Sequence, residues 1–201
     1  MTPKVRAAEK ADIGQLAAVL ADAFFDDPVM EFVVPGGARY FDRLRRLFRM
    51  EIDRHVRLSA AWLAEDPAPV SAALWAPPKR WRHTPMEMMR SAIPSLLVFG
   101  RSVRRSFQVF QAIENAHPSE PHWYLAVLGT ATAAQGRGAG SAVLEPVLER
   151  CDREGAPAYL ESSKAENVPF YERHGFRVTQ DIAAPGGGPV LQAMWRDPQP
   201  R

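Results

Sequence analysis

The chain has 201 residues, of which 46% are hydrophobic and 24% charged, as in an ordinary globular protein. Its net charge of +2 is too small to indicate a nucleic-acid partner. The sequence opens without a signal peptide, and none of its apolar runs approaches the roughly 18 residues that a membrane span needs. We therefore expect a cytoplasmic protein with no membrane partner.

The first half of the chain has the patterns of short strands and amphipathic helices. Alternating residues at 4–8 predict a strand, and the apolar spacing over 12–24 predicts a helix that ends before a proline. A second amphipathic helix is expected over 38–56, with Arg43, Arg45, Arg46 and Arg49 facing solvent. Residues 59–64 and 70–76 have the pattern of an antiparallel pair of strands.

The second half begins with a helical region at 81–117, which we expect to be interrupted at Pro94 and near Gly100. The remaining predicted elements follow in this order: a strand at 122–130, a helix that ends near 154, a strand at 158–162, a short helix that carries Tyr171, and strands at 176–183 and 190–196. This order predicts an α/β (α+β) fold, in which helices pack on a single layer of mixed sheet. We expect one domain over 1–201, with 82–118 as a helical insertion or cover near a ligand site.

A glycine-rich turn separates the strand at 122–130 from the helix that follows it. Glycines at 136, 138 and 140 leave the backbone N–H groups free to point at one place, and the helix N-terminus adds a partial positive charge. Arg137 adds a full charge nearby. The turn therefore suits a phosphate or pyrophosphate, although the same glycines would also serve a turn that is only closely packed.

A dinucleotide-binding fold is one alternative, because it also has a strand, a glycine-rich turn, a helix and a second strand that ends in an acid. Glu161 lies about 25 residues after Gly136, near the roughly 20 that such folds need. The pattern here is Gly-x-Gly-x-Gly, however, and the glycines begin several residues after the strand ends. A nicotinamide-dependent dehydrogenase is therefore a distant alternative.

Three further features accompany the glycine turn: Gln135 before it, Asn167 after the next strand, and the segment Tyr171-Glu172-Arg173-His174-Gly175-Phe176. Together they resemble the GCN5-related N-acetyltransferase (GNAT) superfamily over nearly the whole chain. Segments at 120–126, 135–143, 160–163 and 169–173 are similar, more closely, to the puromycin N-acetyltransferases. The resemblance implies a mostly antiparallel sheet that is splayed at the acetyl-CoA site, with helices on both faces.

The resemblance also implies acetyl-CoA as co-substrate, no metal, and direct transfer of the acetyl group to an amine. The pantetheine arm would pair with the backbone of Val127, Leu128 and Thr130, and Asn167 would steady it. The amide N–H near Leu128 would hold the oxyanion of the reacting carbonyl. The residues expected around the pyrophosphate are Gln135, Gly136, Arg137, Gly138, Ala139, Gly140 and Ser141.

Tyr171 is similar to the tyrosine that protonates the departing thiolate in this superfamily. A phenol has a pKa of about 10 and a thiol a pKa of about 8.5, so the tyrosine hydroxyl stays protonated and can supply a proton to sulfur. A tyrosine next to Phe170 can also simply pack in the core. Many relatives have a glutamate base on the strand that binds the thioester, but 122–130 contains no acid. We expect Glu161 to act as the base, directly or through water, or else to be a structural carboxylate; His122 is a weaker candidate.

The acceptor site is expected in the variable parts of the chain, with Phe25, Asp27, Tyr40 and Trp75 as substrate-binding residues. Each of these aromatics can instead be part of the core, and Asp27 can instead cap a helix. The predicted function is acetylation of a primary amine on a small molecule, such as an aminonucleoside or another antibiotic. A protein or peptide N-acetyltransferase and a non-catalytic CoA-binding sensor remain alternatives. We expect a monomer or a homodimer.

Overall fold

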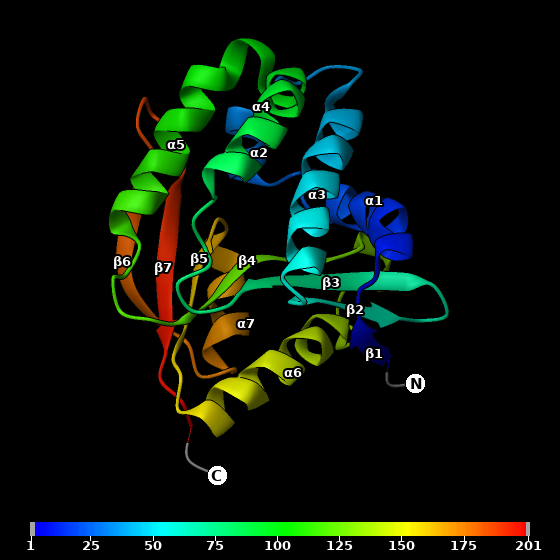
Figure 1. Ribbon diagram of the computed structural model, residues 1–201, viewed down its shortest axis with the longest axis vertical. Helices are drawn as coiled ribbons and strands as arrows, with labels where there is room; N and C mark the ends of the chain where they lie inside the picture. Colours follow the sequence, from blue (N-terminus) through cyan, green and yellow to red (C-terminus); the bar gives the residue numbers. More distant parts are fainter. Residues whose placement is uncertain (1–2, 200–201) are drawn as a thin grey trace.

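The computed structural model describes residues 3–199 and is built on a seven-stranded sheet (Figure 1). The strands are β1 (Lys4–Ala7), β2 (Ala61–Glu65), β3 (Pro69–Ala76), β4 (Trp123–Thr130), β5 (Ala158–Ser162), β6 (Arg177–Ala183) and β7 (Val190–Arg196). Their spatial order is β1-β2-β3-β4-β5-β7-β6, and every neighbouring pair is antiparallel except β4 and β5. This mixed, mostly antiparallel sheet confirms the predicted fold class.

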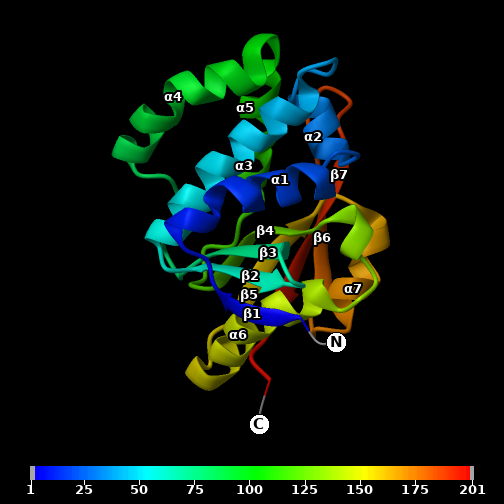
Figure 2. The same cartoon turned by 90° about the vertical axis from the view of Figure 1, so that its right-hand side faces the viewer.

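Helices cover both faces of the sheet. The first face carries α1 (Ile13–Ala23), α2 (Pro28–Val33), α3 (Tyr40–Arg57), α4 (Pro85–Phe99) and α5 (Val103–Ala116); the second carries α6 (Ala139–Glu154) and α7 (Val168–Glu172). Single 3-10 turns lie at Lys10–Asp12, Gly100–Ser102, Thr132–Ala134 and Ala165–Asn167. Figure 2 shows α4 as the helix farthest from the sheet, beyond α3. None of the helices in 3–199 is long and apolar enough to cross a bilayer.

Two buried clusters, one on each face of the sheet, form the core. The alternation of side chains along β3 divides its residues between them: Leu74 packs with α1 and α3, and Trp75 packs with α6 on the other face. On α3, buried Leu44 and Phe48 recur at helical spacing, while Arg45 on the same helix is exposed. Hydrophobic periodicity therefore determines which surface each element buries.

The expected break at Pro94 was wrong, and one short helix was not predicted. α4 runs through Pro94 without a break. A proline inside a helix removes one backbone hydrogen-bond donor, but the helix can continue when the turns on either side keep their hydrogen bonds. The chain does break at Gly100, whose φ of 47° ends the helix. The structure also contains α2, a short helix that was not predicted; it begins at Pro28, where proline is favoured because the N–H that it lacks would be unpaired in any case.

The sheet opens between β4 and β5, which places the candidate site. These parallel strands pair only from Trp123↔Ala158 to Leu125↔Leu160. Immediately beyond, the register of β4 against β3 shifts: Trp75 pairs with Leu125 but Leu74 pairs with Val127, so Ala126 is the extra residue of a β-bulge. β4 continues to Thr130 without β5, and its backbone on that side faces a gap.

Candidate active site

A cavity of about 560 Å³ lies where β4 and β5 separate. Its walls come from β4, the glycine turn before α6, the end of β5, α7, and the connection between α1 and α2. Of the site residues predicted from sequence, those that line it are Asp27, Val127, Leu128, Thr130, Gln135, Gly136, Gly138, Ala139, Gly140, Ser141, Glu161, Asn167 and Tyr171. Segments that are far apart in the sequence thus meet around one space.

The glycine turn presents unpaired backbone donors to this cavity. Gly136 and Gly138 have φ angles of 74° and 84°, in the left-handed region where a side chain would be strained. Gly138 is the N-cap of α6 and offers no side chain to the first turn of the helix, so the amides that follow it stay available. The Gln135 side chain donates to the Thr130 carbonyl oxygen at 3.2 Å and joins the two ends of the turn. This geometry suits an anionic group.

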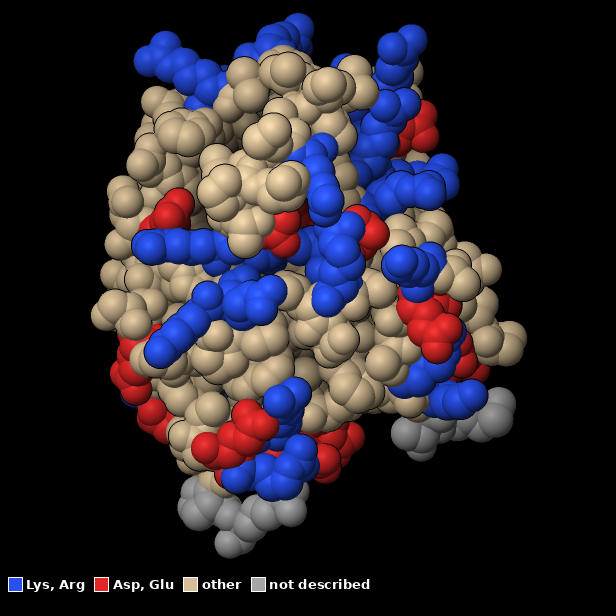
Figure 3. Space-filling model, in the orientation of Figure 1, with Lys and Arg blue, Asp and Glu red and all other residues tan. Residues whose placement is uncertain are grey.

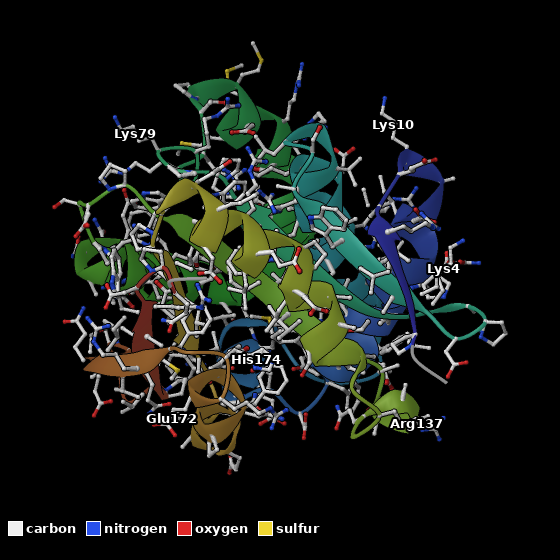
Figure 4. The ribbon with its side chains drawn as sticks, turned by 90° about the horizontal axis from the view of Figure 1, so that it is seen from below. Lys4, Lys10, Lys79, Arg137, Glu172 and His174 are labelled. Carbon is white, nitrogen blue, oxygen red and sulfur yellow. The ribbon has the colours of Figure 1, made fainter. Side chains whose placement is uncertain are left out.

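Arg137 does not line the cavity, although the sequence suggested a charge there. Figure 4 shows it at the outer edge of the molecule, on the loop before α6. A different cation borders the cavity: Arg173, which follows α7 and lies 4.5 Å from the centre of the Phe170 ring. Sequence reasoning missed it, although it stands only two residues after Tyr171. The stacking on Phe170 holds the guanidinium beside the cavity.

The β4 backbone forms one wall of the cavity. Val127, Leu128 and Thr130 pair on one side with β3, while β5 has already diverged on the other. Ser71 of β3 strengthens this end of the strand, because its hydroxyl bonds the Gly129 carbonyl oxygen at 3.0 Å and the Thr130 hydroxyl at 2.8 Å. The exposed edge of β4 can therefore pair with an extended ligand chain, as an added strand would.

Tyr171 reaches the cavity from α7 while remaining 8% exposed. Its ring meets those of Phe170 and Phe176 edge-on. Burial raises the pKa of Tyr171, and the nearby Asp27 carboxylate raises it further. The phenol is thus protonated throughout the physiological range, so its proton is available for a hydrogen bond or for transfer in the cavity.

Asp27 is held by three hydrogen bonds. As the N-cap of α2 it accepts from the backbone N–H groups of Val29 and Met30, at 3.0 and 2.9 Å, and the Ser163 hydroxyl donates to its second oxygen. Burial raises the pKa of this carboxyl. Next to it, Asp26 accepts from Lys164 at 2.7 Å. These two contacts tie the α1–α2 connection to the loop after β5, across one side of the cavity.

The three aromatic residues expected at the acceptor do not reach this cavity. Trp75 is completely buried against α6, since its position on β3 points it to the opposite face from Leu74. Phe25 is 51% exposed and packs edge-on against Tyr40, with ring centroids 5.3 Å apart. The structure therefore assigns Trp75 to the core. Phe25 lies in the α1–α2 connection and packs on Tyr40 at the start of α3, but neither residue lines the cavity.

Glu161 borders the cavity and has an unexpected neighbour, His117. The Nδ1 atom of His117 lies 3.5 Å from Glu161 Oε1, and both side chains are almost completely buried. His117 Nε2 lies 2.9 Å from His122 Nε2. Burial lowers the pKa of His122 to about 4. Sequence reasoning considered His122 alone, whereas the fold brings His117 directly against the carboxylate.

Comparison with known proteins gives a consistent result. The model of the acetyltransferase (GNAT) family matches residues 104–176. An uncharacterized N-acetyltransferase of Schizosaccharomyces pombe is 31% identical over 185 residues, which cover 87% of this chain and 74% of that protein.

Solved structures agree with this result. A Corynebacterium glutamicum structure, described as histone acetyltransferase HPA2 and related acetyltransferase, has a TM-score of 0.76 and 28% identity, over 100% of this chain and 99% of that one. A Drosophila melanogaster polyamine N-acetyltransferase has a TM-score of 0.67 and 15% identity, over 97% and 99%. An agmatine N-acetyltransferase has a TM-score of 0.66 and 17% identity, over 98% and 100%. The last two likenesses show the fold.

Proposed function

Because the chain belongs to the acetyltransferase (GNAT) family, whose co-substrate is acetyl-CoA, we propose that it transfers acetyl directly to a primary amine of a small molecule. The observation that carries this proposal is the cavity at the β4–β5 opening. One wall is unpaired strand backbone, one end is a glycine turn with free amides, and the protonated Tyr171 hydroxyl borders it.

The residues around the cavity suit the parts of acetyl-CoA. The backbone of Val127, Leu128 and Thr130 would pair with the pantetheine amides, as an added strand would, and Asn167 would contact the same arm. The pyrophosphate would bind the amides from Gly136 to Ser141 at the positive end of α6. Arg173 supplies a cation at the cavity wall, while Arg137 on the exposed loop could reach a phosphate only outside it.

The reaction removes two protons from an ammonium nitrogen. In our proposal Glu161 takes the first, so that the free amine can attack the thioester carbonyl. The Leu128 amide would stabilise the oxyanion that forms. When the C–S bond breaks, Tyr171 donates its hydroxyl proton to the thiolate, and it recovers a proton as the new amide nitrogen loses its second one. The net products are the amide, the CoA thiol and one proton.

The cavity's enclosure favours a small acceptor. The bonds from Asp26 to Lys164 and from Asp27 to Ser163 close one side of the cavity, whereas a peptide would need a continuous open groove. Structures with the same fold are named for agmatine, polyamine and arylalkylamine acetylation, which supports the choice of these amines as first candidates. Puromycin and other amine-bearing antibiotics are included because the segments at 120–126, 135–143, 160–163 and 169–173 resemble those of puromycin N-acetyltransferases.

We also propose that residues 1–201 act as one acetyltransferase domain, a monomer or a homodimer, in which 82–118 covers the acceptor side. Helices α4 and α5 make up most of this segment and lie on the same face of the sheet as α1, α3 and Tyr159. Chemical cross-linking of a bound photoreactive amine would test this placement. Labelling confined to α6 or β1 would contradict it.

The test is CoA thiol release from acetyl-CoA with agmatine, tyramine, puromycin and a lysine-containing peptide. We expect turnover with at least one small amine and a fall in kcat of about 10²–10³-fold for Tyr171→Phe. CoA affinity, measured separately, should be unchanged in this variant. Turnover on the peptide alone would favour a protein acetyltransferase. Tight CoA binding without turnover on any amine would favour a sensor, and stabilisation by NAD in place of CoA would overturn the proposal.

A further inference from the structure

His117 lies next to the proposed base, and the acetyl transfer described above does not use it. It follows α5, and its Nδ1 atom faces Glu161 Oε1 at 3.5 Å. Among the described residues 3–199, neither of these two buried atoms has a hydrogen-bond partner of normal geometry. Two unsatisfied polar atoms thus face each other beside the cavity, in a place where an unpaired polar group is costly.

The neighbouring histidine determines where the protons of His117 lie. His122 Nδ1 is 2.6 Å from the carbonyl oxygen of Glu120, so this nitrogen is the donor. Because burial lowers the pKa of His122 to about 4, its ring is neutral near about pH 7 and its Nε2 is an acceptor. The 2.9 Å contact then requires His117 to donate from its own Nε2. If His117 were neutral, the lone pair on Nδ1 would oppose the carboxylate.

We propose that His117 is the positioning residue of Glu161, and that the pair exists at rest as an imidazolium beside a carboxylate. This inference rests on the proposed acetylation, in which Glu161 is the base. A proton on Nδ1 removes the conflict between the two facing atoms and fixes one carboxylate oxygen. The carboxylate also faces the hydroxyl groups of Tyr124 and Tyr159, so the acceptor amine would approach Glu161 beside two phenols. The pair is neutral overall, which lowers the cost of keeping a carboxylate ionised in a buried site.

The proton transfer balances without any other reactant. An N–H bond of the acceptor ammonium breaks and an O–H bond forms on Glu161. The positive charge that leaves the nitrogen then belongs to the pair, as a neutral carboxyl beside the imidazolium of His117. After the product departs, the carboxyl proton passes to solvent and the pair returns to its resting state.

Aromatic residues hold His117 in a place that suits a cation. The Trp81 ring is stacked on the imidazole, with centroids 3.7 Å apart, and an aromatic face attracts positive charge. Arg54 on α3 fixes the Trp81 loop, because its Nη2 donates to the carbonyl oxygens of Arg80, Trp81 and Arg82 at 2.9, 3.0 and 3.2 Å. Trp81 therefore holds the imidazole of His117 in place, and Arg54 in turn holds the loop that carries Trp81.

Two tyrosines face His117 from the sheet. Tyr124 and Tyr159 present their rings edge-on, with centroids 4.8 and 4.9 Å from that of His117. Burial, and then the Glu161 carboxylate, raises the pKa of both hydroxyl groups. Both phenols therefore stay neutral, and the carboxylate of Glu161 is the nearest anion to the imidazole.

Other charged groups lie around α3 and the loop from β3 to α4, which carries Trp81. The Arg82 guanidinium lies 4.8 Å from the Trp81 ring centre and pairs with Glu114 of α5 at 3.3 Å. Glu51 of α3 is near enough to raise the pKa of Tyr124. Figure 3 shows Lys and Arg side chains across the middle of this face, over the loop from β3 to α4. Of the charged groups on this face, Glu161 is the one whose side chain lies against the His117 ring, at 3.5 Å.

The first test is NMR of the histidine ring nitrogens in the whole protein, which needs no turnover. In the wild type at about pH 7, His117 should give the signals of a doubly protonated ring. In Glu161→Gln the same ring should become neutral. His83→Gln is the matched control. His83 is exposed on the loop from β3 to α4, which also carries Trp81, and its loss should leave the His117 signals in place.

The second test measures kcat/KM for agmatine, tyramine and puromycin. If His117 acts through Glu161, His117→Gln should lower kcat/KM by about tenfold or more, and the double variant should be no slower than Glu161→Gln alone. A neutral His117 ring in the wild type, or fully additive losses in the double variant, would overturn the inference. If no amine is acetylated, the proposed function fails, and the NMR result still decides whether the pair exists.

Discussion

Gly129→Ala should destabilise the protein, because α1 leaves no room for a side chain at this point of β4. A Cβ at position 129 would lie 2.7 Å from Leu20 Cδ2, 3.0 Å from Ala23 Cβ and 3.1 Å from a ring carbon of Phe24. Carbon atoms prefer separations of about 3.5–4.0 Å, so α1 would have to move by roughly 0.5–1 Å. Leu20 is fully buried, and a methyl group on Ala23 has no rotamer to change.

Overpacking of this kind costs about 1–3 kcal/mol, and the reduced entropy of the unfolded chain returns about 0.4–1 kcal/mol. We therefore expect the free energy of unfolding to fall by about 1–2 kcal/mol, as measured by urea denaturation followed by circular dichroism. Gly14→Ala is the control. Gly14 lies on α1, and a Cβ added there would meet no atom of another element within 4 Å. Alanine at this position should therefore stabilise the protein by about 0.5–1 kcal/mol. A loss below about 0.3 kcal/mol for Gly129→Ala would refute the close approach of α1 to β4.

Three further predictions follow from the site. Tyr171→Phe should keep its affinity for CoA while kcat falls by about 10²–10³-fold, as measured by thiol release. Asp27→Ala removes the N-cap of α2 and the Ser163 contact, and should lower the free energy of unfolding by about 1–2 kcal/mol in urea. The folded pKa of His122, about 4, lies below its unfolded value of about 6.5, so stability should fall as pH drops through this window, by up to about 3 kcal/mol. Urea titrations at about pH 7 and pH 5 should show about 2 kcal/mol of this loss, and His122→Gln should reduce it.

Much of the fold was predictable because its elements have strong local periodicity. α3 and α6 carry buried residues at helical spacing, and the glycine–proline segments between elements are recognisable from composition alone. Local periodicity gave no such information for α2, which has six residues and depends on the Asp27 cap and a proline at its start. Nor did it distinguish the two faces of β3, so Trp75 was assigned to the acceptor although alternation turns it toward α6.

The site divides in the same way between local and long-range features. The glycine turn was predictable because Gly136 and Gly138 adopt left-handed angles that glycine reaches without strain. The pairing of His117 with Glu161 was not, because it joins the end of α5 to β5 through a contact between residues distant in the sequence. Nothing in the neighbourhood of either residue indicates the other.

The bulge at Ala126 links these features. It lets β4 continue to Thr130 after β5 has turned away, so that one strand supplies both a core wall and an open backbone edge. The same divergence brings the end of β5 to the cavity wall, where Glu161 stands on the face that carries Tyr159 and His117. Closure of the sheet at this point would pair the β4 edge and bury Glu161 away from any amine. The opening is therefore what brings the backbone site and the proposed base pair to the same cavity.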